Sequence, residues 1–237
     1  MSIDFTYHSA STNNQIMQVQ IPAATGFGSK LVNSGEVSNK GVELFVAGTP
    51  LQNTKGLSWD IALNLSNNKS EIVSLYPGLA TQILYSDGEV AIEARPGEPY
   101  GNIVGFKYRG LDDGRLLLDA NGRVQADDKR SILGNIQPKW LAGLTNTISY
   151  KGFVLSALID IRNGGQIYSL SAYDQYTKGT GRFTENGDNL IEDGVIENGS
   201  GGYDKSTKVL IRQDYYAMKV WSGAREALVL SASYVAL

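Results

Sequence analysis

Apolar and polar residues alternate in two runs on either side of a Lys151-Gly152 pair. The first run ends at Tyr150 and the second begins at Phe153. A glycine in a two-residue connection between alternating runs is a strong short-range signal for a β-hairpin. The pattern therefore predicts a hairpin from Trp140 to Arg162 with no helix inside it.

A two-residue turn fixes which residues of this hairpin share a face. The predicted apolar face pairs Tyr150 with Phe153, Ile148 with Leu155, Asn146 with Ala157, Leu144 with Ile159 and Ala142 with Ile161. The opposite face pairs Ser149 with Val154, Thr147 with Ser156, Thr145 with Leu158 and Gly143 with Asp160. Asn146 is a polar exception on the apolar face. We expect it to need a hydrogen bond to a neighbour or, if the sheet belongs to a β-barrel, a contact with a second barrel.

Four further runs alternate in the same way and predict strands. They are Ser2–His8, Asn39–Gly48, Leu57–Ser66 and Ala227–Leu237. In the clearest run, Trp59, Ile61, Leu63 and Leu65 alternate with polar or small residues. We expect these four side chains to lie on the apolar face of the hairpin, within one antiparallel meander.

The connections between the six runs alternate in length. Residues 9–38, 67–139 and 163–226 are long connections, whereas 49–56 and 151–152 are short. Outer-membrane barrels join their strands by short periplasmic turns and long extracellular loops. Each run of the hairpin also has about the 9–11 residues of a tilted transmembrane strand. The predicted fold is all-β, an antiparallel transmembrane β-barrel meander with long extracellular loops.

Composition is compatible with this fold and excludes several others. The chain has 237 residues, a net charge of -3, no cysteine and one histidine. Disulfides, thiolate metal sites and most histidine-based catalytic sites are therefore excluded, and the charge gives no reason to expect a nucleic-acid partner. A mean hydropathy of -0.19 argues against a helical membrane protein. The first residues lack a basic stretch and an apolar stretch, so we expect no signal peptide.

Five segments follow one another along the chain: NSGEVSNKGVELFV (Asn33–Val46), LSWDIALNLSNNKSEIVSL (Leu57–Leu75), LGNIQPKWLAGLTNTISYKGFVLSALIDIRNGG (Leu133–Gly165), IEDGVIENG (Ile191–Gly199) and LSASYVAL (Leu230–Leu237). In this order they resemble segments of the SusC/RagA-type TonB-dependent outer-membrane transporters. The ordered set, rather than any single segment, is specific.

The resemblance implies a function in transport and no enzyme activity or cofactor. It implies a place in the cell outer membrane among its lipids, a SusD-like lipoprotein partner, and import of an oligosaccharide or a peptide driven by the TonB complex through a plug region. Such barrels have about 22 strands. We therefore expect residues 1–237 to be a partial barrel domain from the C-terminal half, without a plug domain, that cannot transport by itself.

Candidate residues follow from the two faces. Those expected to face the barrel lumen are Asp60, Asn64, Thr145, Thr147, Ser156, Asp160 and Arg162. Trp59, Tyr150 and Phe153 are the expected aromatics at the membrane interface, where barrels place such side chains. We expect His8 to be solvated or lumen-facing.

Other groups are open to more than one interpretation. The acidic loop of Glu185, Asp188, Glu192 and Asp193 could hold Ca²⁺, although a solvated loop is favoured. Asn121-Gly122 predicts a type I′ turn rather than a calcium loop. Loop tyrosines could stack on sugar rings: Tyr168, Tyr173, Tyr176 and Tyr203.

Two alternatives to the membrane interpretation remain at this stage. A soluble secreted β-sandwich or carbohydrate-binding module would show the same alternation, with its apolar faces packed against a second sheet. A β-rich hydrolase would need a pair of carboxylates such as Asp60 and Asp160. The chain contains no nucleotide-binding or hydrolase motif.

Overall fold

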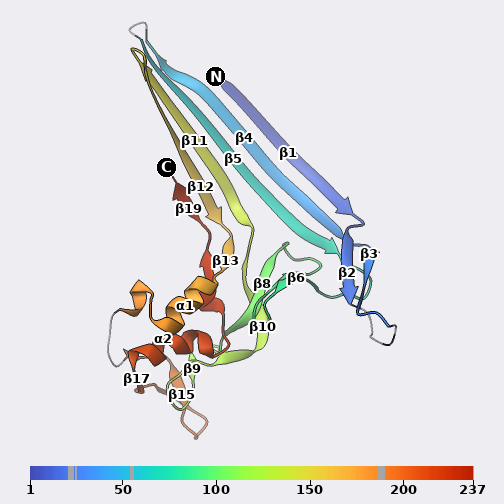
Figure 1. Ribbon diagram of the computed structural model, residues 1–237, viewed down its shortest axis with the longest axis vertical. Coiled ribbons are helices and arrows are strands. Elements are labelled where there is room, and N and C mark those ends of the chain that lie inside the picture. Colours follow the sequence, from blue (N-terminus) through green and yellow to red (C-terminus); the bar gives the residue numbers. More distant parts are fainter. Residues whose placement is uncertain (21–23, 25, 54–55, 186–189, 237) are drawn as a thin grey trace.

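A curved sheet of six antiparallel strands forms the long part of the molecule in this computed structural model (Figure 1). The structure describes residues 1–20, 24, 26–53, 56–185 and 190–236. The strands, in spatial order, are β1 (Ser2–Asn13), β4 (Glu36–Gln52), β5 (Leu57–Ser74), β11 (Pro138–Tyr150), β12 (Phe153–Gly164) and β19 (Tyr234–Ala236). Each strand pairs with the next along the chain within this sheet, so the predicted meander is confirmed.

The β11–β12 hairpin has the register that the sequence predicts. All of the predicted pairs occur, from Tyr150 opposite Phe153 to Ala142 opposite Ile161. Lys151 and Gly152 have φ values of 47° and 89°. Positive φ at both central residues defines a type I′ turn, whose twist matches that of the strands it joins.

The apolar face continues across the sheet without a change of parity. Ile148 lies opposite Trp59, Leu65 lies opposite Leu44, and Leu44 lies opposite Phe5. Directly opposed residues in an antiparallel pair point to the same face. The predicted single apolar face is therefore confirmed.

The strands are longer than the alternation predicts. β1, β4 and β5 continue past His8, Asn39 and Ser66 because their backbone pairing persists where both faces carry polar residues. The 9–38 connection also contains a second hairpin of β2 (Ile16–Gln20) and β3 (Ser29–Asn33). Much of this predicted loop is thus strand, partly as an extension of the large sheet and partly as a separate two-stranded sheet.

The predicted last strand, Ala227–Leu237, is wrong as a single element. Its residues form a helical turn, η3 (Glu226–Leu228), followed by β18 (Val229–Ser231) and β19. β18 pairs with β13 (Gln166–Tyr168), and only β19 pairs with β12. The chain leaves the alternating pattern because Leu228 is fully buried in η3. Leu237 lies outside the described residues.

The other long connections fold into a compact unit at one end of the sheet, which we call the cap (75–137 and 165–232). Its main sheet has the order β10 (Ala126–Asn135), β8 (Asn102–Tyr108), β7 (Ala91–Ala94) and β6 (Gln82–Ser86). Short strands follow: β9 (Leu117–Leu118), β14 (Leu190–Ile191), β15 (Val195–Glu197), β16 (Tyr203–Lys205) and β17 (Val209–Leu210). Its described residues also form the helical elements α1 (Leu170–Lys178), η2 (Arg182–Thr184) and α2 (Arg212–Trp221), together with η3.

The helices of the cap were not predicted. Both are short, and α1 carries local signals that could have been read. Ser169 accepts a hydrogen bond from the Ala172 backbone N–H at 3.1 Å, and Gly179 ends the helix with φ 65°. Among the described residues, no helix has the length and apolar character needed to cross a membrane.

The buried core of the molecule lies mainly in the cap. One cluster contains Leu118, Val124, Leu210 and Met218, and another contains Ala172, Val220 and Leu228. The large sheet has no comparable layer on its apolar face, where Leu155 is 68% exposed and Phe153 is 81% exposed. Ordinary hydrophobic packing therefore accounts for the cap but not for the sheet.

The turn at Asn121-Gly122 differs from the predicted type I′ turn. Among the described residues, the only non-glycine residues with positive φ are Asn14 and Lys151. Asn121 therefore cannot occupy a type I′ position. Instead, the Asp119 carboxylate accepts the backbone N–H groups of Asn121 and Arg123 at 2.8 and 2.9 Å.

We predict that Leu228→Ala destabilises the cap by about 2–5 kcal/mol, because it opens a cavity in a fully packed site. Leu230→Ala is the matched control, since Leu230 lies two residues away and is 40% exposed. Native-state hydrogen exchange of peptides from 166–231 would measure both changes. Equal losses of protection in the two variants would contradict this assignment of the core.

Candidate functional site

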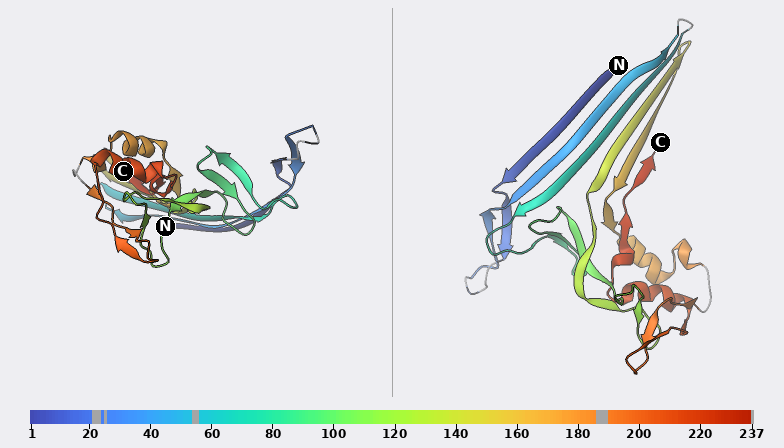
Figure 2. Two further views of the ribbon diagram at one scale, coloured as in Figure 1. Left: turned by 90° about the horizontal axis from the view of Figure 1, so that it is seen from below. Right: turned by 180° about the vertical axis from the view of Figure 1, so that it is seen from behind.

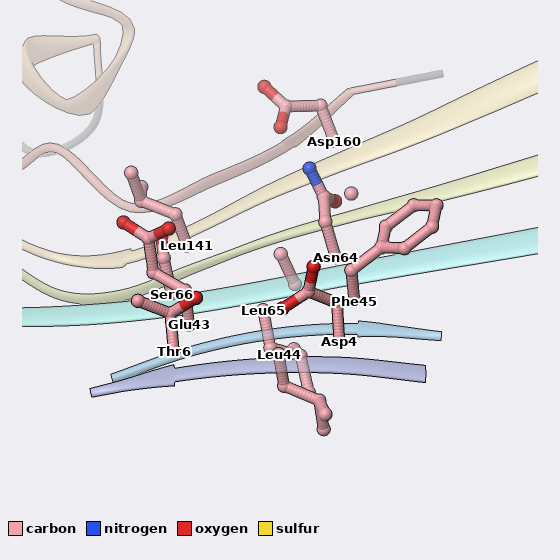
Figure 3. A pocket seen from close by; sticks show the side chains of 12 residues that line it. Asp4, Thr6, Glu43, Leu44, Phe45, Asn64, Leu65, Ser66, Leu141 and Asp160 are labelled. Carbon is pink, nitrogen blue, oxygen red and sulfur yellow. The ribbon is translucent and has the colours of Figure 1, made fainter. Parts of the chain in front are cut away.

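The concave face of the large sheet carries polar side chains in rows that cross several strands. In one row Asp4, Phe45, Asn64, Gly143 and Asp160 lie opposite one another in turn. Figure 2 shows the curvature of the sheet, and Figure 3 shows these side chains on one side with Leu44 and Leu65 on the other. Carboxyl and amide groups are thus concentrated on the concave face, although it also carries apolar side chains such as Phe45.

A hollow of about 500 Å³ lies on this face. Acidic, hydroxyl, amide and aromatic groups line it: Asp4, Thr6, Glu43, Phe45, Asn64, Ser66 and Asp160, with Leu141 beside them. Gly143 makes room at its centre, because a Cβ atom there would lie 2.3 Å from Asn64 Oδ1. The Asn64 side chain thus occupies the space that a side chain at position 143 would fill.

The predicted lumen residues all lie on this face by register, and several have local partners. Asp60 accepts a hydrogen bond from Thr49 Oγ1 at 2.6 Å. The hydroxyls of Thr147 and Ser156 are 3.2 Å apart. Asp160 accepts one from the Tyr234 hydroxyl at 2.8 Å.

The Arg162 guanidinium donates a hydrogen bond to the carbonyl of Ile136 at 3.3 Å. Its buried Nε has no partner among the described residues.

The structure does not bring Asp60 and Asp160 together. They lie on β5 and β12, with β11 between them, and their rows are four residues apart. Standard strand spacings place their Cα atoms roughly 17 Å apart. Paired glycosidase carboxylates are about 5–9.5 Å apart, so this geometry does not support the hydrolase alternative.

His8 belongs to a polar ladder that the sequence did not indicate. Its Nε2 is 3.3 Å from Asn68 Oδ1, and Asn68 donates to Ser70 Oγ at 3.2 Å. Ser70 in turn donates to Asn39 Oδ1. The available signal was the recurrence of Asn and Ser at alternate positions beyond the apolar part of β5.

The convex face carries an apolar band with aromatic side chains at both ends. Tyr150 and Phe153 lie opposite each other at one end, and Trp59 lies one row inside them. Tyr7 and Trp140 mark the other end, at the level of Asn67. With strands tilted by about 40°, the ten-residue step from Leu57 to Asn67 gives a band about 25 Å high.

The candidate groups in the cap have structural partners. Tyr168, Tyr173 and Tyr176 pack against the cluster around Leu228, which leaves Tyr203 as the exposed tyrosine of the four. Buried Glu192 is paired with Lys219. Burial, reinforced by the Glu192 carboxylate, raises the pKa of Tyr215 to about 12.

The calcium hypothesis gains no support from this arrangement. Asp193 lies 3.4 Å from Lys205 Nζ, and Asp188 lies outside the described residues. Within the described part of the chain, no three acidic or histidine side chains are grouped for a metal ion.

Comparison with known proteins agrees with this geometry. TonB-dependent receptor P3 of Formosa agariphila is 27% identical over 191 residues, 70% of this chain and 19% of that protein. TonB-dependent receptor SusC of Bacteroides thetaiotaomicron is 24% identical over 163 residues, 61% of this chain and 16% of SusC. No family model matches the chain.

The fold of the chain is also similar to part of a solved structure. The RagAB peptide transporter aligns with a TM-score of 0.58 and 23% identity, over 79% of this chain and 20% of the matched one. The resemblance to SusC/RagA-type receptors is confirmed. The chain spans between about a sixth and a fifth of the length of the proteins that it matches. By name, these proteins are receptors and a transporter.

The SusC/RagA-type fold generates a prediction about the two faces of β12. Leu155 and Val154 are neighbours, each 68% exposed, but Leu155 lies on the convex face. We expect Leu155→Arg to lower the free energy of unfolding of the vesicle-bound chain by about 1–3 kcal/mol, because arginine is costly in hydrocarbon. Val154→Arg should cost much less, since water reaches the concave face. Urea titration would compare them, and equal costs would contradict the assignment of faces.

Proposed function

We propose that this chain forms part of the barrel of a SusC/RagA-type TonB-dependent transporter in the cell outer membrane. The observation that carries this proposal is the apolar convex band, about 25 Å high, bounded by aromatic side chains at both ends. This height and this arrangement fit the hydrocarbon layer that outer-membrane barrels span. The polar concave face behind it would border the passage for the substrate.

The exposed apolar surface supports a lipid environment. A soluble protein rarely leaves a continuous apolar face of this size uncovered. None of the described elements packs over the band as the second sheet of a sandwich would. Lipid chains would cover it without requiring another protein layer.

The lumen-facing residues would act as a hydrophilic wall rather than as a catalytic centre. Asp60, Asn64, Thr145 and Thr147 offer carboxylate, amide and hydroxyl groups at successive levels, and Ser156, Asp160 and Arg162 do so on the next strand. These groups can exchange hydrogen bonds with a polar solute that passes along the wall. Trp59, Tyr150 and Phe153 would anchor the barrel at the periplasmic interface.

The substrate is proposed to be a bulky nutrient, an oligosaccharide or a peptide. Support for a peptide comes from the similarity to the RagAB peptide transporter, and support for a TonB-driven process comes from the names of the receptors above. We propose a SusD-like lipoprotein that closes over the cap, and a plug region on which the TonB complex acts. The cap is the exposed part of the chain available for ligand capture.

Transport would require more strands than this chain contains. Six strands of a large barrel form an open arc, with unpaired backbone groups along β1 and most of β12. Such groups cost several kcal/mol each in hydrocarbon. We therefore propose that residues 1–237 act as a section of the barrel domain, together with the strands that close it.

We predict that the chain alone sediments in aqueous buffer and disperses in detergent, because its convex face and strand edges lack partners. Analytical ultracentrifugation with and without detergent would measure this. Reconstituted in liposomes, it should give no ligand-specific uptake of oligosaccharides or peptides. A monodisperse protein in buffer would support the soluble sandwich instead and contradict the membrane proposal.

Topology gives a further prediction. The Lys151 turn adjoins Gly56, through a hydrogen bond from its N–H to the Gly56 carbonyl at 3.4 Å, at the end of the sheet opposite the cap (Figure 1). We propose that the Lys151-Gly152 turn and the 49–56 connection are periplasmic and that the cap is extracellular. The chain has no cysteine, so Gln52→Cys and Ser200→Cys provide unique labelling sites.

In whole cells that display the chain in the outer membrane, an impermeant thiol reagent should label position 200 and leave position 52 unlabelled. Lysed cells serve as the control, because both positions should then react. Labelling at 52 with protection at 200 would reverse the proposed topology.

A further inference from the structure

Two lysines face each other across β4 and β5, just beyond the apolar band. Lys40 is directly opposite Lys69 in the register of the two strands. Both lie on the convex face, because Lys40 follows the parity of Val42 and Lys69 that of Leu65. Like charges directly opposed on one face of an antiparallel pair are destabilising. The sheet thus carries a local repulsion that a bound anion would relieve.

The protein itself neutralises this pair only in part. Lys69 Nζ lies 3.6 Å from Glu71 Oε2, with the two side chains 70% and 43% exposed. Ion pairs at such exposure contribute little. Within the described part of the chain, no carboxylate lies within 4 Å of the Lys40 ammonium group.

A hydroxyl donor lies beside the pair. Ser9 is directly opposite Lys40 on β1. Ammonium and hydroxyl groups together suit a phosphate, whose oxygens accept several hydrogen bonds.

The depth of the pair indicates where such a phosphate would come from. The apolar band ends at the row of Tyr7, Val42 and Asn67. Lys40 and Lys69 lie two residues further, about 7 Å along the strand and about 5 Å in depth at a 40° tilt. The headgroup layer of a bilayer occupies roughly the first 5–7 Å outside the hydrocarbon edge, so the pair lies at headgroup depth. Lysine side chains also extend readily along an apolar surface to reach headgroups.

We propose that Lys40 and Lys69 bind the phosphate-bearing headgroup of a lipid in the leaflet on the side of the cap. This inference rests on the membrane placement proposed above. It adds a specific lipid contact to what is otherwise a general apolar surface. The contact would fix the depth of β4 and β5 at the point where they leave the membrane.

Binding of the whole chain to two kinds of vesicle tests this proposal. The chain is diluted from detergent into vesicles of phosphatidylcholine alone, or of phosphatidylcholine with about one third phosphatidylglycerol, and the bound fraction is measured by flotation. Each lysine near an anionic surface contributes roughly fivefold to binding. The double variant Lys40→Gln/Lys69→Gln should therefore reduce the preference for anionic vesicles by roughly 25-fold.

The matched control is Lys107→Gln/Lys129→Gln, which removes the same charge from exposed positions on β8 and β10 in the cap. This control should change the preference less than about twofold. Glu71→Gln should increase the preference for anionic vesicles, because the Lys69 ammonium group then no longer pairs with the Glu71 carboxylate. Equal losses in the two double variants, or a wild-type chain without any anionic preference, would overturn the lipid contact.

The neutral vesicles keep the two proposals distinguishable. A chain that fails to enter phosphatidylcholine vesicles contradicts the membrane placement itself. A chain that enters both kinds of vesicle equally contradicts only the headgroup contact. Inorganic phosphate that abolished the anionic preference at constant ionic strength would overturn the lipid assignment in favour of a soluble anion.

Discussion

The continuous backbone ladder of the large sheet is the interaction on which the rest of the structure depends. In hydrocarbon, an unpaired N–H or C=O group has no water to bind, so every strand needs a neighbour along its whole length. The ladder also fixes side-chain parity. A slip of one residue between β4 and β5 would turn Leu44, Trp59 and their neighbours to the concave face. Backbone pairing and the separation of apolar from polar surface are therefore one constraint.

The ladder continues beyond the apolar band and holds the cap. β4 and β5 extend by several residues past Lys40 and Lys69, and β10 leads through Ile136 into β11. Within the cap, Arg225 joins separate segments, because its N–H donates to the Phe106 carbonyl and its guanidinium lies 3.2 Å from Glu89. The cap is thus stabilised as a soluble domain is, by buried side chains and internal hydrogen bonds, while the sheet depends on its surroundings.

The concave face has a different character from both. Asp4, Glu43, Asp60 and Asp160 lie along it, and none of them has a lysine or arginine within ion-pair distance among the described residues. Carboxyl groups without such partners need hydrogen bonds from water, because a polar group left without any is costly. An acidic wall behind an apolar band is consistent with a passage for polar solutes.

Local pattern determined the large sheet, and tertiary packing decided the cap. Alternation and the Lys151-Gly152 turn predicted the β11–β12 register, the shared face of Trp59 and Leu155, and the shared opposite face of Asp60 and Asp160, because a strand with two different faces carries a period of two in its sequence. No such period marks the cap, where side chains from distant segments share small cores. The burial of Leu228 and the split of the last strand therefore followed from contacts between segments far apart in the sequence, whereas α1 also has local capping signals at Ser169 and Gly179. The same holds for His8, whose partner Asn68 depends on the pairing of β1, β4 and β5.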